Sequence, residues 1–92
     1  MISPETIRDI RKRSGLTQVQ MARTLDVRQA TISAWENGKQ HPTKPYAVAL
    51  LQWDRRLREM SESSWKDFGR EILSLAVAAG LLAAMRKIFG SE

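Results

Sequence analysis

The stretch of sequence that decides the fold runs from Thr17 to Gly38 and reads TQVQMARTLDVRQATISAWENG. Its apolar residues recur at helical spacing in two short blocks, one before Asp26 and one after it. Asp26 stands where the chain must turn, and Asn37-Gly38 is a strong helix-stop signal. The pattern therefore predicts two short amphipathic helices joined by a tight turn.

The first of these helices has a clear start and a clear inner face. Thr17 and Gln20 have the three-residue spacing of a capping box, so the helix should begin at Thr17. Met21, Ala22 and Leu25 form its apolar face, with the small Ala22 where two helices would cross closely.

The second helix is expected from about Arg28 to Glu36. Val27 should fill the core just before it, and Ile32 and Trp35 should anchor its inner face. Its outer face carries uncharged side chains that can form hydrogen bonds.

Helical signals also precede and follow this pair, and no stretch of the sequence predicts a strand. A helix is expected from Pro4 to Ser14, with Ser3 as its N-cap and Gly15 as its left-handed exit. Another helix, capped by Thr43, should reach about Met60.

The polar run Ser61–Ser64 is the best boundary in the chain. We therefore expect an all-α fold, with a domain of residues 1–60 followed by a C-terminal apolar helix within residues 64–90. This last helix should run unbroken from near Trp65 to Phe89, with Ser64 and Asp67 at its start.

The apolar character of the last helix raises the question of what covers it. Ile72–Met85 spans fourteen residues without a charge, whereas a membrane-spanning helix needs about 20 apolar residues. A membrane-tethered protein is therefore the weaker alternative. The helix could fold wholly onto its own domain, or it could also pack against a second copy in a two-fold dimer, and we favour the dimer.

Residue size supports the dimer hypothesis. Ala76, Gly80 and Ala84 place small residues every four positions, which would let two helix backbones approach closely. The predicted interface or inter-helix residues are Leu57, Trp65, Phe68, Ile72, Leu75, Ala76, Ala79, Gly80 and Leu82.

The positive charge of the chain is concentrated in its N-terminal half. Up to Pro45 there are eight Lys and Arg against four Asp and Glu, and from Tyr46 onward there are seven against six. Counterion release favours the binding of such a basic region to a polyanion, so nucleic acid is the expected partner. A merely solubilising basic surface is the alternative.

Composition excludes other classes of protein. The chain has no cysteine, so disulfides and thiolate metal sites are excluded. No catalytic triad, carboxylate pair or metal-ligand cluster is visible, so we expect no enzyme, no catalytic residue, no metal and no cofactor. The charged N-terminus lacks the apolar segment of a signal peptide, and a cytoplasmic location is expected.

The run GLTQVQMARTLDVRQATISAWENGKQHP resembles the lambda-repressor/Cro-type helix-turn-helix family, also called the XRE family. The resemblance covers about Ile7–Leu51. Its markers are Gly15-Leu16-Thr17-Gln18, Met21-Ala22, Leu25, Val27, Thr31-Ile32-Ser33, Trp35-Glu36-Asn37-Gly38 and Pro42. The resemblance implies a bacterial or phage-type transcription regulator whose second motif helix enters the major groove of double-stranded DNA. A homodimeric repressor on a palindromic operator is the expected form.

The resemblance also implies roles for individual residues. Gln18 matches a phosphate-binding position, and Gln29 and Ala30 match positions that reach base edges. Gln29 would pair with adenine, and Ala30 would meet a thymine methyl. The expected base contacts are Arg28, Gln29, Ala30 and Ala34; the expected DNA-backbone contacts are Gln18, Thr31, Ser33, Asn37 and Lys39; and the expected structural pair is Arg11 with Glu36.

Two residues depart from the family pattern. Asp26 stands where glycine is usual in the turn, although Asp tolerates left-handed geometry better than most residues. Arg28 stands where a Ser or Thr N-cap is common, and its charge faces the positive end of the helix dipole. We interpret Arg28 as a DNA-contact residue.

Several of these positions also have a purely structural interpretation. Thr31 and Ser33 could be solvated helix positions, and His41 is expected to be an exposed bystander in its loop.

An interaction protein is the alternative function: an antitoxin-like regulator would use the C-terminal helix to capture a partner protein.

Overall fold

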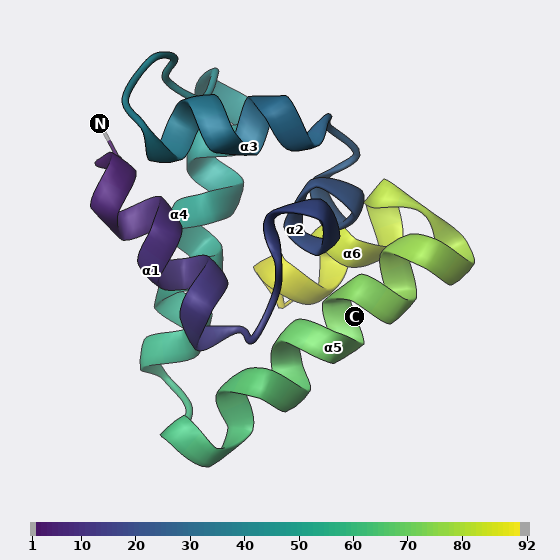
Figure 1. Ribbon diagram of the computed structural model, residues 1–92. Coiled ribbons are helices and arrows are strands. Elements are labelled where there is room, and N and C mark those ends of the chain that lie inside the picture. The colour runs from purple at the N-terminus through teal and green to yellow at the C-terminus, as the bar shows by residue number, and fades with distance from the viewer. Residues whose placement is uncertain (1, 91–92) are drawn as a thin grey trace.

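The computed structural model describes residues 2–90, which form six helices and no strand. The helices in Figure 1 are α1 (Pro4–Arg13), α2 (Gln18–Leu25), α3 (Gln29–Glu36), α4 (Lys44–Arg58), α5 (Glu62–Ala79) and α6 (Leu81–Phe89). The all-α prediction is confirmed, and α2 and α3 are the two short helices predicted on either side of Asp26.

Local sequence determines where α1 and α2 begin. The Ser3 hydroxyl accepts a hydrogen bond from the amide of Thr6 at 3.1 Å. Thr17 and Gln20 form the predicted capping box: the Thr17 hydroxyl accepts from the Gln20 amide at 3.1 Å, and the Gln20 side chain accepts from the Thr17 amide at 2.9 Å. These bonds satisfy amides that the first turn of each helix leaves free.

Asp26 makes the turn between α2 and α3. With φ 56° and ψ 46° it is the one non-glycine residue of the described range 2–90 with a positive φ. The amide of Val27 then donates to the carbonyl of Ala22 at 2.9 Å, which closes the end of α2. The predicted left-handed turn through Asp26 is therefore confirmed.

One apolar core runs through the whole fold. Trp53 of α4 is completely buried, and its indole N–H donates to the Ser14 hydroxyl at 3.0 Å. The core contains side chains from before and after Ser61, so α5 and α6 pack on the helix-turn-helix unit and not apart from it. Its fully buried members include Ile10, Met21, Leu25, Ile32, Leu50, Leu57, Ile72 and Ile88.

The prediction of one unbroken C-terminal helix is wrong. Gly80, at φ 92° and ψ 180°, adopts a backbone conformation that is essentially restricted to glycine, and the chain reverses there. As a result α6 lies beside α5 in a helical hairpin (Figure 1) and also packs on α4. Ala84 becomes fully buried, so Ala76, Gly80 and Ala84 do not form a line along one helix.

The start of α5 differs from the prediction, and within residues 2–90 the cap of α4 lacks its side-chain hydrogen bond. α5 begins at Glu62 behind Ser61, and not near Trp65, because Ser61 takes the extended N-cap conformation three residues earlier than Ser64. Thr43 does occupy the N-cap position of α4, but within the described residues its side chain accepts no hydrogen bond from the first turn.

The hairpin changes the surroundings of the predicted interface residues. Leu57, Phe68 and Ile72 are at most 5% exposed within their own chain, so they act as inter-helix contacts and are not free for a partner. The Trp65 indole N–H donates to the Leu57 carbonyl at 2.8 Å. Leu75, Ala76 and Gly80 are half-buried, whereas Ala79 and Leu82 are exposed.

None of the helices within residues 2–90 has the length and apolar character needed to cross a membrane.

Candidate DNA-binding site

Helix α3 lies at one end of the molecule, opposite the start of α5 (Figure 1). Its first turn is its most accessible part, because Arg28, Gln29 and Ala30 are all exposed. Thr31, Ser33 and Ala34 are half-buried. The base-contact residues predicted at the helix tip therefore lie together on a free surface, and Ala34 lies one turn further along.

Buried side chains hold α3 in place from behind. Ile32 is fully buried and Trp35 is 3% exposed, with its ring 5.7 Å from the ring of Tyr46 between centroids. Val27 packs against the same core just before the helix. These contacts fix the inner face of α3, as the sequence predicted, and leave its outer face for a ligand.

A chain of hydrogen bonds fixes the position of the Gln29 side chain. Its amide nitrogen donates to Gln18 Oε1 at 2.8 Å, and Gln18 Nε2 donates in turn to Glu36 Oε1 at 3.1 Å. Gln18 and Gln29 thus lie side by side although α2 and α3 carry them on separate helices. The oxygen of Gln29 and the second N–H of each side-chain amide stay available for another partner.

Glu36 anchors this chain to α1, and we call Glu36, Arg11, Arg8, Gln18 and Gln29 the Glu36 network. Arg11 donates to both carboxylate oxygens of Glu36, at 2.7 and 2.9 Å, and Arg8 donates to the Glu36 carbonyl at 2.9 Å. The Glu36 side chain is only 2% exposed. The predicted pairing of Arg11 with Glu36 is present in the structure.

The protonation of Glu36 follows from these partners. Burial by itself would raise the pKa of its carboxyl, but hydrogen bonds from Arg11 and Gln18 and the charges of Arg11 and Arg8 outweigh burial and hold that pKa below its ordinary value. The hydrogen bond to Glu36 correspondingly raises the pKa of Arg11. The pair is therefore fully charged at neutral pH.

The residues predicted to contact the DNA backbone flank the tip of α3. Asn37 and Lys39 are exposed in the loop after the helix, where the Lys39 amide donates to the Ala34 carbonyl at 2.9 Å. The Asn37 side chain donates to the Ser33 hydroxyl at 3.3 Å. In this structure Ser33 and Asn37 are bonded to each other at the end of α3.

Arg28 occupies the N-cap position of α3 with extended backbone, φ −78° and ψ 151°. A guanidinium group has no hydrogen-bond acceptor, so it cannot cap the free amides of the first turn. The expected loss of the cap is confirmed. Those amides remain directed outward at the positive end of the helix dipole, where an anion is favoured.

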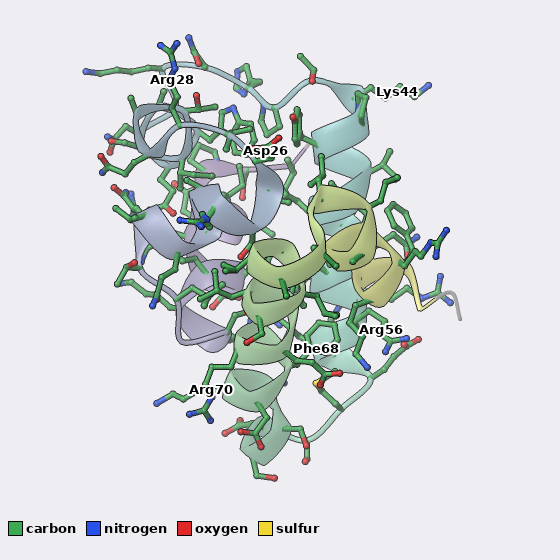
Figure 2. The ribbon with its side chains drawn as sticks, turned by 90° about the vertical axis from the view of Figure 1, so that its right-hand side faces the viewer. Asp26, Arg28, Lys44, Arg56, Phe68 and Arg70 are labelled. Atoms are coloured by element: carbon green, nitrogen blue, oxygen red, sulfur yellow. The ribbon has the colours of Figure 1, made fainter. Side chains whose placement is uncertain are left out.

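The sequence interpretation missed two features of this surface. Figure 2 shows Lys44 at the same end of the molecule as Arg28, with both side chains pointing outward. The hydrogen bond between Gln18 and Gln29 was also not foreseen, although it joins two residues that were each singled out. Lys44 directly follows the predicted N-cap Thr43, so its place in the sequence could have indicated an exposed positive charge there.

The turn at Asp26, the buried α2–α3 pair and the exposed tip of α3 define a helix-turn-helix protein. The helix-turn-helix family model matches residues 7–52, half of the 92-residue chain, and the chain belongs to this family. No curated protein and no solved structure matches it. The chain is thus a DNA-binding transcription regulator of the lambda-repressor, or XRE, kind.

Proposed function

We propose that this protein is a repressor that binds a palindromic operator as a homodimer in the cytoplasm, with the tip of α3 in the major groove. The observation that carries the proposed DNA contact is the Glu36 network, which holds Gln29 on an exposed surface at the start of α3. A base-contacting side chain discriminates best when its own position is fixed beforehand.

Gln29 and Ala30 are the proposed base contacts. A glutamine can pair with both N6 and N7 of adenine, and an alanine methyl can pack on the methyl group of thymine. Gln29 donates one amide proton to Gln18 and keeps its oxygen and second proton for a base. Arg28 and Ala34 would contact bases on either side of this pair.

Charged and polar groups around the tip would bind the DNA backbone. Gln18 at the start of α2, Thr31 and Ser33 on α3, and Asn37 in the following loop supply hydrogen-bond donors. Lys39 and Lys44 supply positive charge for contacts with phosphates. Arg28 adds a third positive charge beside them. Such contacts set the orientation of the protein on the duplex without selecting a sequence.

Exposed apolar side chains support the proposal that a second copy of the chain binds. Among residues 2–90, the large apolar side chains with marked exposure number six, and all but Val19 lie on α4 or the hairpin: Val48, Leu51, Val77, Leu82 and Phe89. Leu82 is 75% exposed beside the Gly80 turn, and Ala79 is also exposed. We propose that a two-fold partner covers these side chains and that the two α3 helices of the dimer bind half-sites about 34 Å apart.

The base-contact role is tested by Gln29→Ala. Selection of bound DNA from a random pool provides the operator, and a palindromic result is expected. Gln29→Ala should then weaken binding to this operator by about 1–3 kcal/mol and leave binding to unrelated DNA nearly unchanged. Gln52→Ala on α4 is the control and should leave both unchanged. Equal losses on both DNAs would contradict the proposed role.

The homodimer is tested separately by light scattering. Wild-type protein should have the mass of two chains, and Leu82→Glu should reduce it to one. Val19→Glu adds the same charge to another exposed apolar position, on α2, which is 63% exposed, and should leave the dimer intact. A wild-type mass of one chain would rule out the dimer. Repression is tested by placing the selected operator within a promoter that drives a reporter gene.

A further inference from the structure

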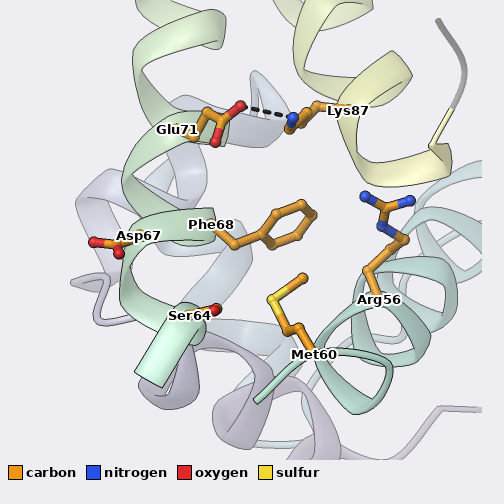
Figure 3. A pocket seen from close by; sticks show the side chains of 7 residues that line it. All are labelled: Arg56, Met60, Ser64, Asp67, Phe68, Glu71 and Lys87. Atoms are coloured by element: carbon orange, nitrogen blue, oxygen red, sulfur yellow. Dashed lines mark ion pairs between the residues drawn. The ribbon is translucent and has the colours of Figure 1, made fainter. Parts of the chain in front are cut away.

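A pocket of about 290 Å³ lies where α4, α5 and α6 meet. Figure 3 shows Phe68 of α5 at its centre, with Met60 on one side and the charged ends of Arg56 and Lys87 on the others. Its size is close to the lower end of the range for small-molecule sites, about 300–1,000 Å³. The pocket shares no residue with the proposed DNA-binding surface.

Two basic and two acidic side chains line the pocket, and their ion pairs leave one of the basic side chains without a partner within the described residues. Lys87 is paired with Glu71 at 2.7 Å, and this ion pair joins α6 to α5. Asp67 is paired with Arg70 at 2.7 Å, and in Figure 3 its carboxylate points away from Phe68. Arg56 has no ion-pair partner among residues 2–90, so one positive charge in the pocket stays uncompensated.

Arg56 is also held in one place. Its guanidinium carbon lies 5.5 Å from the centroid of the Phe68 ring, within the range of a cation–π contact. The side chain is half-buried, and its end lies close to Gly90, where α6 ends. A guanidinium group held in this way presents a preformed fork to a planar anion.

We propose that this pocket binds a small organic carboxylate that carries an apolar group. The carboxylate would accept two hydrogen bonds from Arg56, and the apolar group would pack on the Phe68 ring and the Met60 side chain. One free cation beside an aromatic surface suits a monoanion of this kind better than a phosphate, which would require more than one positive group. Lys87 closes the far side of the site through its pair with Glu71.

A ligand in this position would touch α4, α5 and α6 at once. Arg56 lies in the last turn of α4 and Met60 lies just after that helix, whereas Phe68 and Lys87 belong to the hairpin. Because the ligand binds only the folded arrangement, it should stabilise the docking of the hairpin on α4.

The test uses the full chain and defined probes. Backbone amide resonances are followed by NMR during titration with phenylacetate and hexanoate, and with benzylamine and acetate for comparison. Phenylacetate or hexanoate should shift resonances around Phe68 and Lys87 with saturation. Benzylamine, which lacks the anion, and acetate, which lacks the apolar group, should bind at least about tenfold more weakly.

Charge variants identify the residue responsible. Arg56→Gln should weaken phenylacetate binding about tenfold or more, whereas Arg55→Gln, which removes an exposed neighbouring charge, should leave binding unchanged. Arg56→Lys keeps the charge and should retain part of the affinity. If Arg56→Gln does not fold, the affinity of Arg56→Lys for phenylacetate is compared with that of wild type instead.

The proposal is overturned if neither apolar carboxylate binds, or if acetate or benzylamine binds with the same affinity as phenylacetate. It is also overturned if the folded Arg56 variants do not differ from wild type as stated. None of these results would affect the test of DNA binding through Gln29.

Discussion

Gly69 of α5 lies directly against Ser14 at the end of α1: a Cβ placed on Gly69 would be 2.8 Å from the Cβ of Ser14 and would overlap its carbonyl oxygen. Ser14 also accepts the hydrogen bond of the Trp53 indole at 3.0 Å. Three helices therefore meet at Ser14, and the absence of a side chain at Gly69 is what lets α5 reach it.

Gly69→Ala should destabilise the protein although it improves helix propensity. Replacement of a helical glycine by alanine favours the helix by about 1 kcal/mol, but here the methyl group must displace backbone atoms, at a cost of about 1–3 kcal/mol or more. We expect a net loss of stability in urea denaturation. Ser74→Ala, at an exposed position of α5, is the control and should be nearly neutral. A gain in stability for Gly69→Ala would show that α5 does not need this close approach.

Asp26→Gly should stabilise the protein. The left-handed conformation of Asp26 costs a residue with a Cβ about 1 kcal/mol relative to glycine, and the side chain is exposed. Thermal denaturation should show a higher midpoint for Asp26→Gly. Asp26→Asn removes the charge but keeps the Cβ and tolerates the same conformation, so it should give little or none of the gain. If Asp26→Asn is as stabilising as Asp26→Gly, charge and not backbone conformation is the cause.

Arg28→Ser should change stability and DNA affinity in opposite directions. A serine at this N-cap can accept a hydrogen bond from the first turn of α3, worth about 1 kcal/mol, which arginine cannot do. Removal of the exposed positive charge should weaken DNA binding and reduce its salt dependence. Denaturant titration and a DNA-binding titration at several salt concentrations measure the two effects. An unchanged affinity would mean that Arg28 does not contact DNA.

Glu36 should make stability depend on pH in the acidic range. Because its pKa is lowered in the folded state, its contribution is present above the ordinary carboxyl pKa of about 4.3 and is lost as the pH falls through the lower folded value. Glu36→Gln leaves Arg11 unpaired in a partly buried site and should cost about 3 kcal/mol at pH 7. The difference between the two proteins in free energy of unfolding should become smaller as the pH is lowered from 5 to 3. The decrease should be about 1.4 kcal/mol for each unit by which folding lowers the pKa of Glu36. A difference that stays constant over that range would contradict the assignment.

The features predicted correctly from the sequence depend on neighbours in the chain. The capping box joins Thr17 and Gln20, which are three positions apart, and the turn at Asp26 follows from the end of one apolar block and the start of the next. The exposure of Gln29 and the burial of Trp35 follow from helical spacing on α3 alone. Such features are determined locally, and tertiary packing did not override them.

The features that were missed depend on contacts between distant segments. Gly80 fits a helix with small residues every four positions, and only the fit of α6 against α4 and α5 favours a break there. Once α6 folds back, Leu57, Phe68 and Ile72 become core residues, although their spacing alone suits an intermolecular interface equally well. The bond between Gln18 and Gln29 likewise required the crossing of α2 and α3, which periodicity does not give.

The shared core has a consequence for how the protein loses activity. Since the hairpin supplies Phe68, Ile72, Ala84 and Ile88 to the same core that supports α3, loosening of the hairpin removes packing that holds α3 in place. We expect unfolding to be a single cooperative transition, with slow amide exchange lost together in α2, α4 and α5. The occupancy of an operator would then depend on the folding of the hairpin, which lies outside the proposed DNA-binding surface.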